Sequence, residues 1–301
     1  MSRTITVGLD GSPESLAAAE WAAREATLRG LALRLLHVYE PVPEPMAQAP
    51  LLGAETHQHW SEKIPRETAG GVRLRHPGVE VTAEHLAGRP SEVLAEAART
   101  TELLVLGSRG MSGIRGFLVG SVGLAVVARA QCPVVLVRAG EQAADEHERD
   151  PAGIPSAATA YRPVVLGLDT GHPDASMIEF AFDAAARRET VLRVVHGWSR
   201  PSYYSYGGAA ELWRYEDLAQ GEATALAEAL RPWREKYPAV DVTEVSRLAN
   251  PAEQLINASR EASLVVVGRR IRRKPFGVHI GSVTHAVLHH AVSPVAVVAH
   301  D

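Results

Sequence analysis

The chain has 301 residues, of which 46% are hydrophobic and 22% are charged, so its length and composition suit about two globular domains. Its formal net charge of −4 at pH 7 makes nucleic acid or another polyanion an unlikely class of partner. One cysteine, Cys132, excludes an intramolecular disulfide framework and fits a reducing cytoplasm. Because Cys132 precedes Pro133 and an apolar run, we expect a small buried hydrophobe there rather than a nucleophile.

The first residues run straight into an alternating segment, so no secretory signal is expected. The most apolar region, 119–137, is broken by Arg129, Gln131 and Pro133 and falls short of a membrane span. A cytoplasmic protein with no membrane partner is therefore the expectation.

Short apolar strands then alternate with helical segments. Strands are predicted at 5–9, 31–38, 79–86, 103–107 and 134–137, and helices at 13–29, 51–75, 91–100 and 121–130. Ser12 is the expected cap of the first helix and Gly30 its stop, whereas Pro65 could break the second helix. Residues 39–50 contain four prolines and are expected to be irregular. This alternation predicts a parallel sheet with helices on both faces.

After a charged and small-residue stretch at 140–160, which we interpret as a linker, the chain repeats itself. The segment Val164–Asp169 matches Ile5–Asp10 at an offset of 159, and Gly268 with 281–283 matches Gly107 with 120–122 at an offset of 161. Constant offsets across the chain indicate a tandem duplication. The predicted domains are therefore 1–139 and 161–301, each an α/β unit with a five-stranded parallel sheet.

Glycines punctuate the connection that follows the strand at 103–107. Gly107, Gly110, Gly120 and Ser121 form the spacing G-x2-G-x9-G-S, which ends where a helix begins. Free N–H groups near a helix N-terminus favour an anion, which suggests a phosphate cradle. The alternative is a strand-to-helix connection whose glycines only allow tight turns. The spacing alone leaves both interpretations open.

Asp10 follows the first strand and would face the same crevice if the strands at 5–9 and 103–107 are neighbours. It could bind a ribose or adenine edge or help to hold Mg²⁺. It could also serve, with Ser12, to cap the next helix, and the two roles are compatible. No P-loop lysine motif is present, and the first turn has only Gly8 and Gly11, not G-x-G-x-x-G.

The first half resembles the universal stress protein family, whose members have a Rossmann-like fold related to adenine nucleotide α-hydrolases and bind ATP. The family pattern is met by Gly107, Gly110, Gly120 and Ser121, by Asp10, by Val38 and by the G-x-P step of Gly88 and Pro90. The resemblance covers roughly 1–138 and again 161–300, as in tandem-domain members.

The resemblance implies a concrete ATP site, with Mg²⁺ as a candidate companion ion. Asp10, with Ser12 beside it, and Val38 would take the adenosine end. The N–H groups of Gly107, Ser108, Arg109 and Gly110 would take ribose and the α-phosphate, and those of Gly120, Ser121 and Val122 the β- and γ-phosphates. The Ser121 hydroxyl and the Arg109 charge could add to phosphate binding.

The second half departs from this pattern because Ile271 stands where the middle glycine should be. A β-branched residue disfavours positive φ and blocks close backbone approach. The remaining positions form a weaker second site of Asp169, Gly268, Arg269, Gly281, Ser282 and Val283, for which we expect weak or absent ATP binding. The basic run at 269–274 suggests either an anion or nucleic-acid patch or, more simply, a solvated loop.

The leading hypothesis is a nucleotide-dependent stress regulator or sensor, not an enzyme, since no nucleophile, base or metal constellation is evident; slow hydrolysis stays open. His285, His289 and His290 have helical spacing, but no carboxylate or cysteine partner is identifiable and no metal is expected. The second hypothesis is an interaction protein with relic sites, pairing as a homodimer or intrachain pseudo-dimer through the edge strands 134–137 and 295–298. An adenine nucleotide α-hydrolase-type enzyme is third, because residues 9–13 lack its Ser-Gly-Gly-x-Asp-Ser-like loop.

Overall fold

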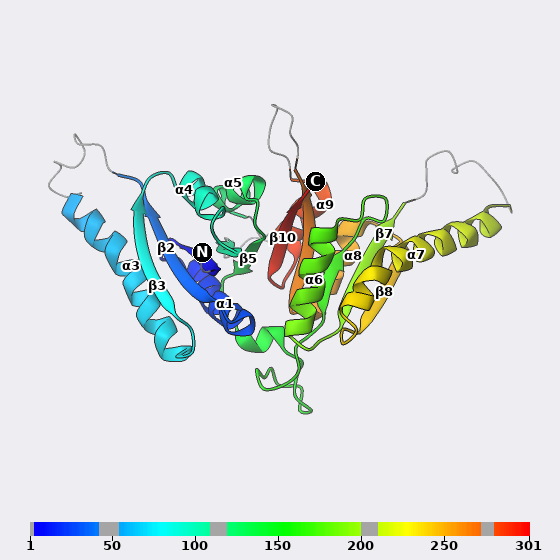
Figure 1. Ribbon diagram of the computed structural model, residues 1–301, viewed down its shortest axis with the longest axis horizontal. Helices are drawn as coiled ribbons and strands as arrows, with labels where there is room; N and C mark the ends of the chain where they lie inside the picture. Colours follow the sequence, from blue (N-terminus) through cyan, green and yellow to red (C-terminus); the bar gives the residue numbers. More distant parts are fainter. Residues whose placement is uncertain (1–2, 42–53, 109–118, 200–209, 272–279) are drawn as a thin grey trace. The chain divides into compact units, whose positions relative to one another are not determined.

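The computed structural model of the protein describes residues 3–41, 54–108, 119–199, 210–271 and 280–301 (Figure 1). Its described part divides into two compact units, and the chain passes from the first to the second between Ala143 and Ala144. Each unit is an α/β domain with a five-stranded parallel sheet, as the repeat predicted.

The first unit alternates strands and helices along the chain. Its elements are β1 (Thr4–Leu9), α1 (Pro13–Arg29), β2 (Ala32–Tyr39), α3 (Ala54–Arg75), β3 (Val81–Ala87), α4 (Pro90–Ala97), β4 (Leu103–Ser108), α5 (Ser121–Arg129) and β5 (Val134–Arg138). The strand order is β3-β2-β1-β4-β5, and every described pairing is parallel. All five strands therefore end at one edge of the sheet, and β1 lies between β2 and β4.

The second unit repeats this order. Its elements are β6 (Val164–Gly167), α6 (Ala175–Arg187), β7 (Leu192–Trp198), α7 (Ala210–Lys236), β8 (Val242–Leu248), α8 (Pro251–Ala258), β9 (Leu264–Arg270), α9 (Ser282–His290) and β10 (Val295–His300). The strand order is β8-β7-β6-β9-β10, again with parallel pairings. The duplication inferred from two sequence offsets is therefore a duplication of topology.

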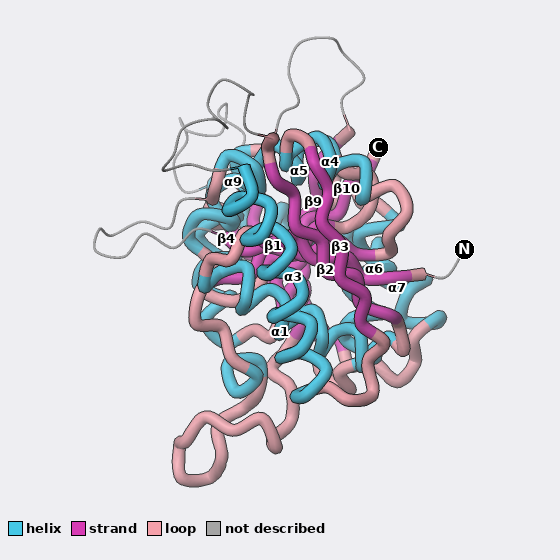
Figure 2. Tube along the Cα trace, turned by 90° about the vertical axis from the view of Figure 1, so that its left-hand side faces the viewer, coloured by secondary structure: helices cyan, strands magenta, loops and turns pink. Residues whose placement is uncertain are grey.

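Helices cover both faces of the first sheet. Figure 2 shows α1 and α3 lying along the strands, where α1 contacts β1 and β4 and α3 contacts β2 and β3. On the other face α4 and α5 pack on one another and on the strands. The central strands are buried on both sides, with Ile5, Val7 and Val105 at 0% exposure, which explains their continuous rather than alternating apolar sequence.

Helix α1 begins and ends where its sequence predicted. The Ser12 hydroxyl accepts a hydrogen bond from the Ser15 N–H at 3.2 Å, and Pro13 occupies the first helical position. At the other end Gly30 adopts a φ of 63°, and its N–H bonds to the Ala26 and Thr27 carbonyls.

Helix α3 differs from expectation because it runs through Pro65 without a break. Proline removes one backbone hydrogen bond, but the helix buries Ala69 and Val72 completely against the sheet. Tertiary packing therefore outweighs the local penalty, as it does in α7, which contains Pro232.

The stretch interpreted as a linker has local structure. A 3₁₀ turn, η1 (Ala143–Glu146), is followed by isolated antiparallel bridges that pair His147 with Tyr161 and Arg149 with Pro155. The centroids of the His147 and Tyr161 rings lie 4.0 Å apart. Of the proline-rich stretch, residues 42–50 lie outside the described residues. No helix in the described part of the chain is both long and apolar enough to cross a membrane.

Candidate functional site

A pocket of about 210 Å³ opens at the carboxyl ends of β1, β2 and β4, between the start of α1 and the starts of α4 and α5. Seven of the predicted binding residues line it: Asp10, Ser12, Val38, Gly107, Gly120, Ser121 and Val122. The parallel order places β1 beside both β2 and β4, so segments far apart in the sequence meet at one crevice.

The turn between β1 and α1 forms one wall of this pocket. The Asp10 Oδ1 atom accepts hydrogen bonds from the Ser12 N–H, at 2.9 Å, and from the Ser12 hydroxyl. The Asp10 N–H donates to the Ser15 hydroxyl at 3.4 Å, and Gly11 between them has a φ of 81°. The capping role predicted for this turn is therefore present through Ser12, and the Asp10 side chain still lines the pocket.

Gly107 lies where β4 passes closest to α1. A Cβ atom at this position would lie 2.6 Å from the Glu14 carbonyl carbon and 2.7 Å from the Ser15 nitrogen. Because both neighbours are backbone atoms, a side chain would force the helix away from the strand. The close packing of β4 on α1 therefore requires a glycine here, whatever ligand the pocket takes, and this reason was not predicted from the sequence.

The start of α5 forms the opposite wall. Gly120 is the N-cap residue, has no side chain to bond the first turn, and is followed by exposed Ser121 and Val122. The first N–H groups of a helix have no partner within the helix, and the N-cap residue Gly120 has no side chain to bond them. Such a terminus attracts an anion through its hydrogen-bond donors and its dipole.

The floor of the pocket is apolar and was not predicted from the sequence. It is formed by Leu36, Leu94 and Leu106 around Gly8, where a Cβ would lie 2.5 Å from the Leu106 side chain. An apolar slot next to uncapped N–H donors suits a ligand with a flat apolar part and an anionic part. The missed signal is the period of two that puts Leu36 on the same strand face as Val38.

Glu14 also lines the pocket and was missed. It lies in the first turn of α1, where the helix dipole favours an acidic residue. An acid at this position is common in helices, so the sequence gives no specific signal of a binding role.

Of the remaining predicted residues, Ser108 does not join this pocket as a side chain. The Ser108 hydroxyl donates to the Val137 carbonyl at 3.1 Å, is buried against β5 and does not line the pocket. Arg109 and Gly110 lie outside the described residues.

The second unit presents the corresponding residues in a different setting. The Asp169 carboxylate is exposed and accepts a hydrogen bond from the Gly171 N–H at 3.0 Å. A Cβ at Gly268 would meet the His300 ring nitrogen Nε2 at 2.7 Å. Arg269, the counterpart of Ser108, is buried, and burial lowers the pKa of its guanidinium. Gly281, Ser282 and Val283 form an uncapped start of α9, as in the first unit.

Two further differences affect this second crevice. The Ile271 N–H donates to the His300 carbonyl at 2.6 Å, so it is engaged by β10. Gly197 stands at the repeat position of Val38, and a Cβ there would lie 2.7 Å from the Pro251 Cα atom and 3.0 Å from the Ala249 carbonyl oxygen. The place that the Val38 side chain takes in the first unit is therefore taken by backbone in the second. The basic residues from Arg272 to Lys274 lie outside the described residues.

The histidines of α9 and Cys132 are the residues that the sequence offered as candidates for metal binding or nucleophilic chemistry. In the described residues no three His, Cys, Asp or Glu side chains come together as a metal-ion site. His285 and His289 face each other on α9, with ring centroids 4.3 Å apart. Burial raises the pKa of the Cys132 thiol to about 11, which suppresses the reactive thiolate.

Comparisons with known proteins complete these observations. The model of the universal stress protein family matches residues 1–138 and 160–299. Universal stress proteins of Mycobacterium bovis and Mycobacterium tuberculosis are each 34% identical over 97% of this chain and 96% of their own length. One from Mycolicibacterium smegmatis is 32% identical over 98% of this chain and 96% of its own length. The crystal structure of a universal stress protein from Archaeoglobus fulgidus aligns with this chain over 100% of both chains, with a TM-score of 0.69 and 16% sequence identity. At this identity the similarity is one of fold.

Proposed function

Because this chain belongs to the universal stress protein family, we propose that it binds ATP in the pocket of its first unit and acts as a nucleotide-dependent regulator or sensor in a stress response. The observation that carries this proposal is that an apolar slot adjoins a helix start whose N-cap residue, Gly120, has no side chain to bond the first N–H groups. The slot suits a base, and the helix start suits phosphates.

The roles follow the positions around the pocket. Asp10, with Ser12 beside it, and Val38 would hold the adenosine end. Backbone N–H groups of 107–110 would take ribose and the α-phosphate, and those of Gly120, Ser121 and Val122 the β- and γ-phosphates. Magnesium normally reaches such sites with the phosphates and one or two carboxylates, and Asp10 and Glu14 are the carboxylates lining this pocket.

The second unit would bind ATP weakly or not at all. Backbone packed against Gly197 leaves no room for a side chain like that of Val38, which lines the first pocket. Ile271 replaces the middle glycine of the cradle, and its N–H is bonded within the sheet. We accordingly propose domains 1–139 and 161–301, with the first carrying the working site.

Binding rather than turnover is the proposed activity. Phosphoryl transfer needs positioned charge at the γ-phosphate, and the polar groups in the described part of the pocket are carboxylates, serine hydroxyls and backbone. ATP occupancy would bias conformation or association, the latter as a homodimer or as an intrachain pseudo-dimer in the cytoplasm.

The experiment compares two matched variants. Gly120→Glu puts a bulky acid at the proposed phosphate end, and Gly281→Glu puts the same acid at the equivalent position of the second unit, where a Cβ meets nothing within 4 Å. We expect Mg-ATP to raise the melting temperature of the wild type and of Gly281→Glu, but not that of Gly120→Glu. Circular dichroism of each variant without nucleotide checks that the fold is intact.

Two outcomes would count against the proposal. If Gly120→Glu responds to ATP like the wild type, the cradle is misplaced. If the wild type shows no ATP-dependent shift and releases no nucleotide on denaturation, the site is a relic and the alternative of an interaction protein gains support.

A further inference from the structure

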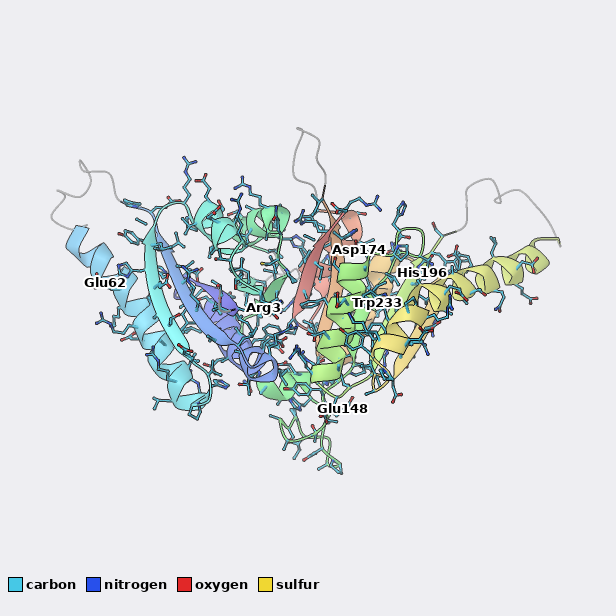
Figure 3. All side chains as sticks on the ribbon, viewed as in Figure 1. Arg3, Glu62, Glu148, Asp174, His196 and Trp233 are labelled. Carbon is cyan, nitrogen blue, oxygen red and sulfur yellow. The ribbon has the colours of Figure 1, made fainter. Side chains whose placement is uncertain are left out.

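We propose that His196 and Glu222 form a proton-operated clamp that fastens α7 to the carboxyl end of β7 in the second unit. The contact joins the sheet to a long helix at the edge where the strands end (Figure 3). The proposal does not rest on nucleotide binding in the first unit.

Both ring nitrogens of His196 face acceptors. Nδ1 lies 2.9 Å from the Leu168 carbonyl oxygen, and Nε2 lies 2.9 Å from the Glu222 Oε2 atom. A carbonyl oxygen and a carboxylate oxygen accept hydrogen bonds and do not donate them. The closed contact therefore needs a ring that carries both protons, an imidazolium.

Thr170 joins the loop after β6 to the same contact. Its hydroxyl lies 3.2 Å from the Glu222 Oε2 atom and 3.3 Å from the His196 Nε2 atom. The Glu222 carboxylate and the Thr170 hydroxyl thus both contact Nε2 of His196. In a catalytic triad the carboxylate and the nucleophilic hydroxyl contact opposite nitrogens of the histidine ring. The cluster is suited to holding elements together rather than to activating a nucleophile.

Loss of one proton would break one side of the clamp. A neutral ring presents a lone pair either from Nδ1 to the Leu168 carbonyl, which is repulsive, or from Nε2, where the Thr170 hydroxyl can donate to it but the Glu222 carboxylate loses its donor. The His196 side chain is 6% exposed and that of Glu222 is 34% exposed. Water can therefore replace a lost hydrogen bond of the Glu222 carboxylate more easily than one of the His196 ring. Histidine is the side chain that ordinarily changes charge between pH 5 and 8. The clamp should therefore be closed at the acidic end of this range and loosened at the alkaline end.

Among the described residues, four further acids on elements that pack near β7 have partners of their own. On β8, Ser246 lies opposite His196, and the nearby Glu244 pairs with Arg234 of α7 at 2.6 Å. On α6, Glu179 pairs with Lys236 and Asp183 with Arg187. In the loop after β6, Asp169 lies 3.6 Å from His172. Glu222 is thus the carboxylate placed against the His196 ring.

The first unit offers a comparison. His37 occupies the repeat position of His196, and its Nδ1 lies 2.8 Å from the Leu9 carbonyl oxygen. The described His–Glu contact between this sheet and α3 is His85 with Glu62, at 3.9 Å and with both side chains more than a third exposed. Solvent screens a contact of that kind. The short, buried version is a feature of the second unit.

Hydrogen exchange along α7 tests the clamp in the full-length protein. We expect protection factors of residues 216–226, corrected for intrinsic exchange, to fall by about tenfold in the wild type from pH 6 to pH 8. Glu222→Gln should remove this pH dependence. Glu228→Gln, which changes an exposed acid of the same helix, should keep it. Peptides of β9 serve as an internal control for global opening.

Nitrogen-15 NMR of the histidine rings measures the protonation of His196 directly. This second measurement does not depend on whether the Glu222 variant folds. The His196 ring, assigned by its loss in His196→Gln, should carry protons on both nitrogens at pH 6. A neutral ring at pH 6, or α7 protection that does not change with pH in the wild type, would overturn the proposal.

Discussion

Gly107 shows how one residue can serve the packing of the fold and border a ligand pocket at once. Its missing side chain lets the first turn of α1 approach β4, and the same residue lines the pocket. A glycine at this place therefore does not by itself identify a binding site.

Gly107→Ala should destabilise the first unit because a methyl group would lie within 2.8 Å of Glu14 and Ser15 atoms. Overpacking of this kind costs about 1–3 kcal/mol, which thermal melting would show as a loss of several degrees. Gly70→Ala is the matched control, since a Cβ there meets nothing within 4 Å in the middle of α3. Equal stability of Gly107→Ala and the wild type would refute the close approach of α1 to β4.

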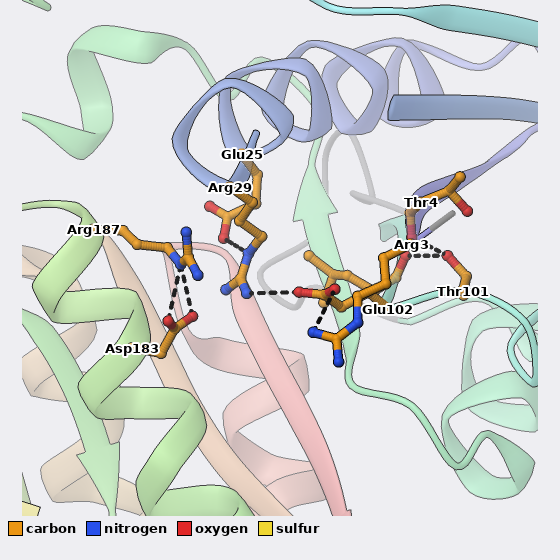
Figure 4. A network of polar contacts seen from close by, with 9 residues as sticks. Arg3, Thr4, Glu25, Arg29, Thr101, Glu102, Asp183 and Arg187 are labelled. Carbon is orange, nitrogen blue, oxygen red and sulfur yellow. Dashed lines mark hydrogen bonds and ion pairs between the residues drawn. The ribbon is translucent and has the colours of Figure 1, made fainter. Parts of the chain in front are cut away.

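At the scale of elements, buried charge fixes the end of α1. Glu25 and Arg29 pair at 2.6 Å with side chains 1% and 5% exposed, and Arg29 reaches Glu102 at 3.6 Å (Figure 4). Glu102 also donates its N–H to the Thr4 carbonyl, which joins the helix end to the start of β1. Removing the Glu25 charge would leave the buried Arg29 guanidinium with the more distant carboxylate of Glu102, at 3.6 Å.

Glu25→Gln should therefore lower the free energy of unfolding by about 1.5–3 kcal/mol, because it weakens a buried hydrogen bond between charged groups. Glu96→Gln is the control, because its pair with Arg99 at 3.2 Å is largely exposed and should contribute less than about 1 kcal/mol. Urea denaturation of both variants measures the difference. Similar losses in the two variants would show that the Glu25 pair is not specially buried.

A second ionic contact joins α1 to α3 and should depend on pH. Burial raises the pKa of Glu20, but hydrogen bonds from Arg75, at 2.5 Å, and from His76 outweigh it, so the net shift is downward. A carboxyl with a lowered folded pKa stabilises above its unfolded pKa and loses that stabilisation as pH falls through the folded value. The contribution should be complete above about pH 5 and lost progressively below about pH 4.

Glu20→Gln should lower the free energy of unfolding at pH 7 by about 0.5 kcal/mol, since the contact is partly solvent-screened. The difference between variant and wild type should shrink as denaturation is repeated at lower pH. A difference that stays constant or grows on acidification would contradict the assigned shift.

The sequence predicted the elements well because their signals are local. Strands such as Leu103–Ser108 are uninterrupted apolar runs, and the cap at Ser12 and stop at Gly30 have distinctive residues. The break expected at Pro65 did not occur. The cost of a proline is a local backbone effect that the sequence shows, whereas the packing of α3 on the sheet, which outweighs it, depends on residues far away in the chain. The pocket floor was also missed, because Leu36, Leu94 and Leu106 look like ordinary core residues until the strand order brings them together.

The second crevice shows the same limit. The repeat aligns Gly197 with Val38, but the glycine alone does not reveal that the backbone at Pro251 fills the space beside it. Likewise His37 and His196 look equivalent in sequence, whereas only the fold places Glu222 against the second.

At the scale of the whole molecule, duplication has preserved topology while the two crevices have diverged. Both units have the same strand order and an uncapped helix start after the fourth strand. The first combines that start with an open apolar slot that Val38 lines, and the second has backbone at the place of the Val38 side chain and a histidine–glutamate contact. We therefore expect functional asymmetry, with one nucleotide site in a chain of two similar domains.

Isothermal titration of the full-length protein with Mg-ATP tests this claim most directly. We predict one site per chain in the wild type and in Gly281→Glu, and none in Gly120→Glu. Two sites per wild-type chain, or one site that survives in Gly120→Glu and disappears in Gly281→Glu, would contradict it.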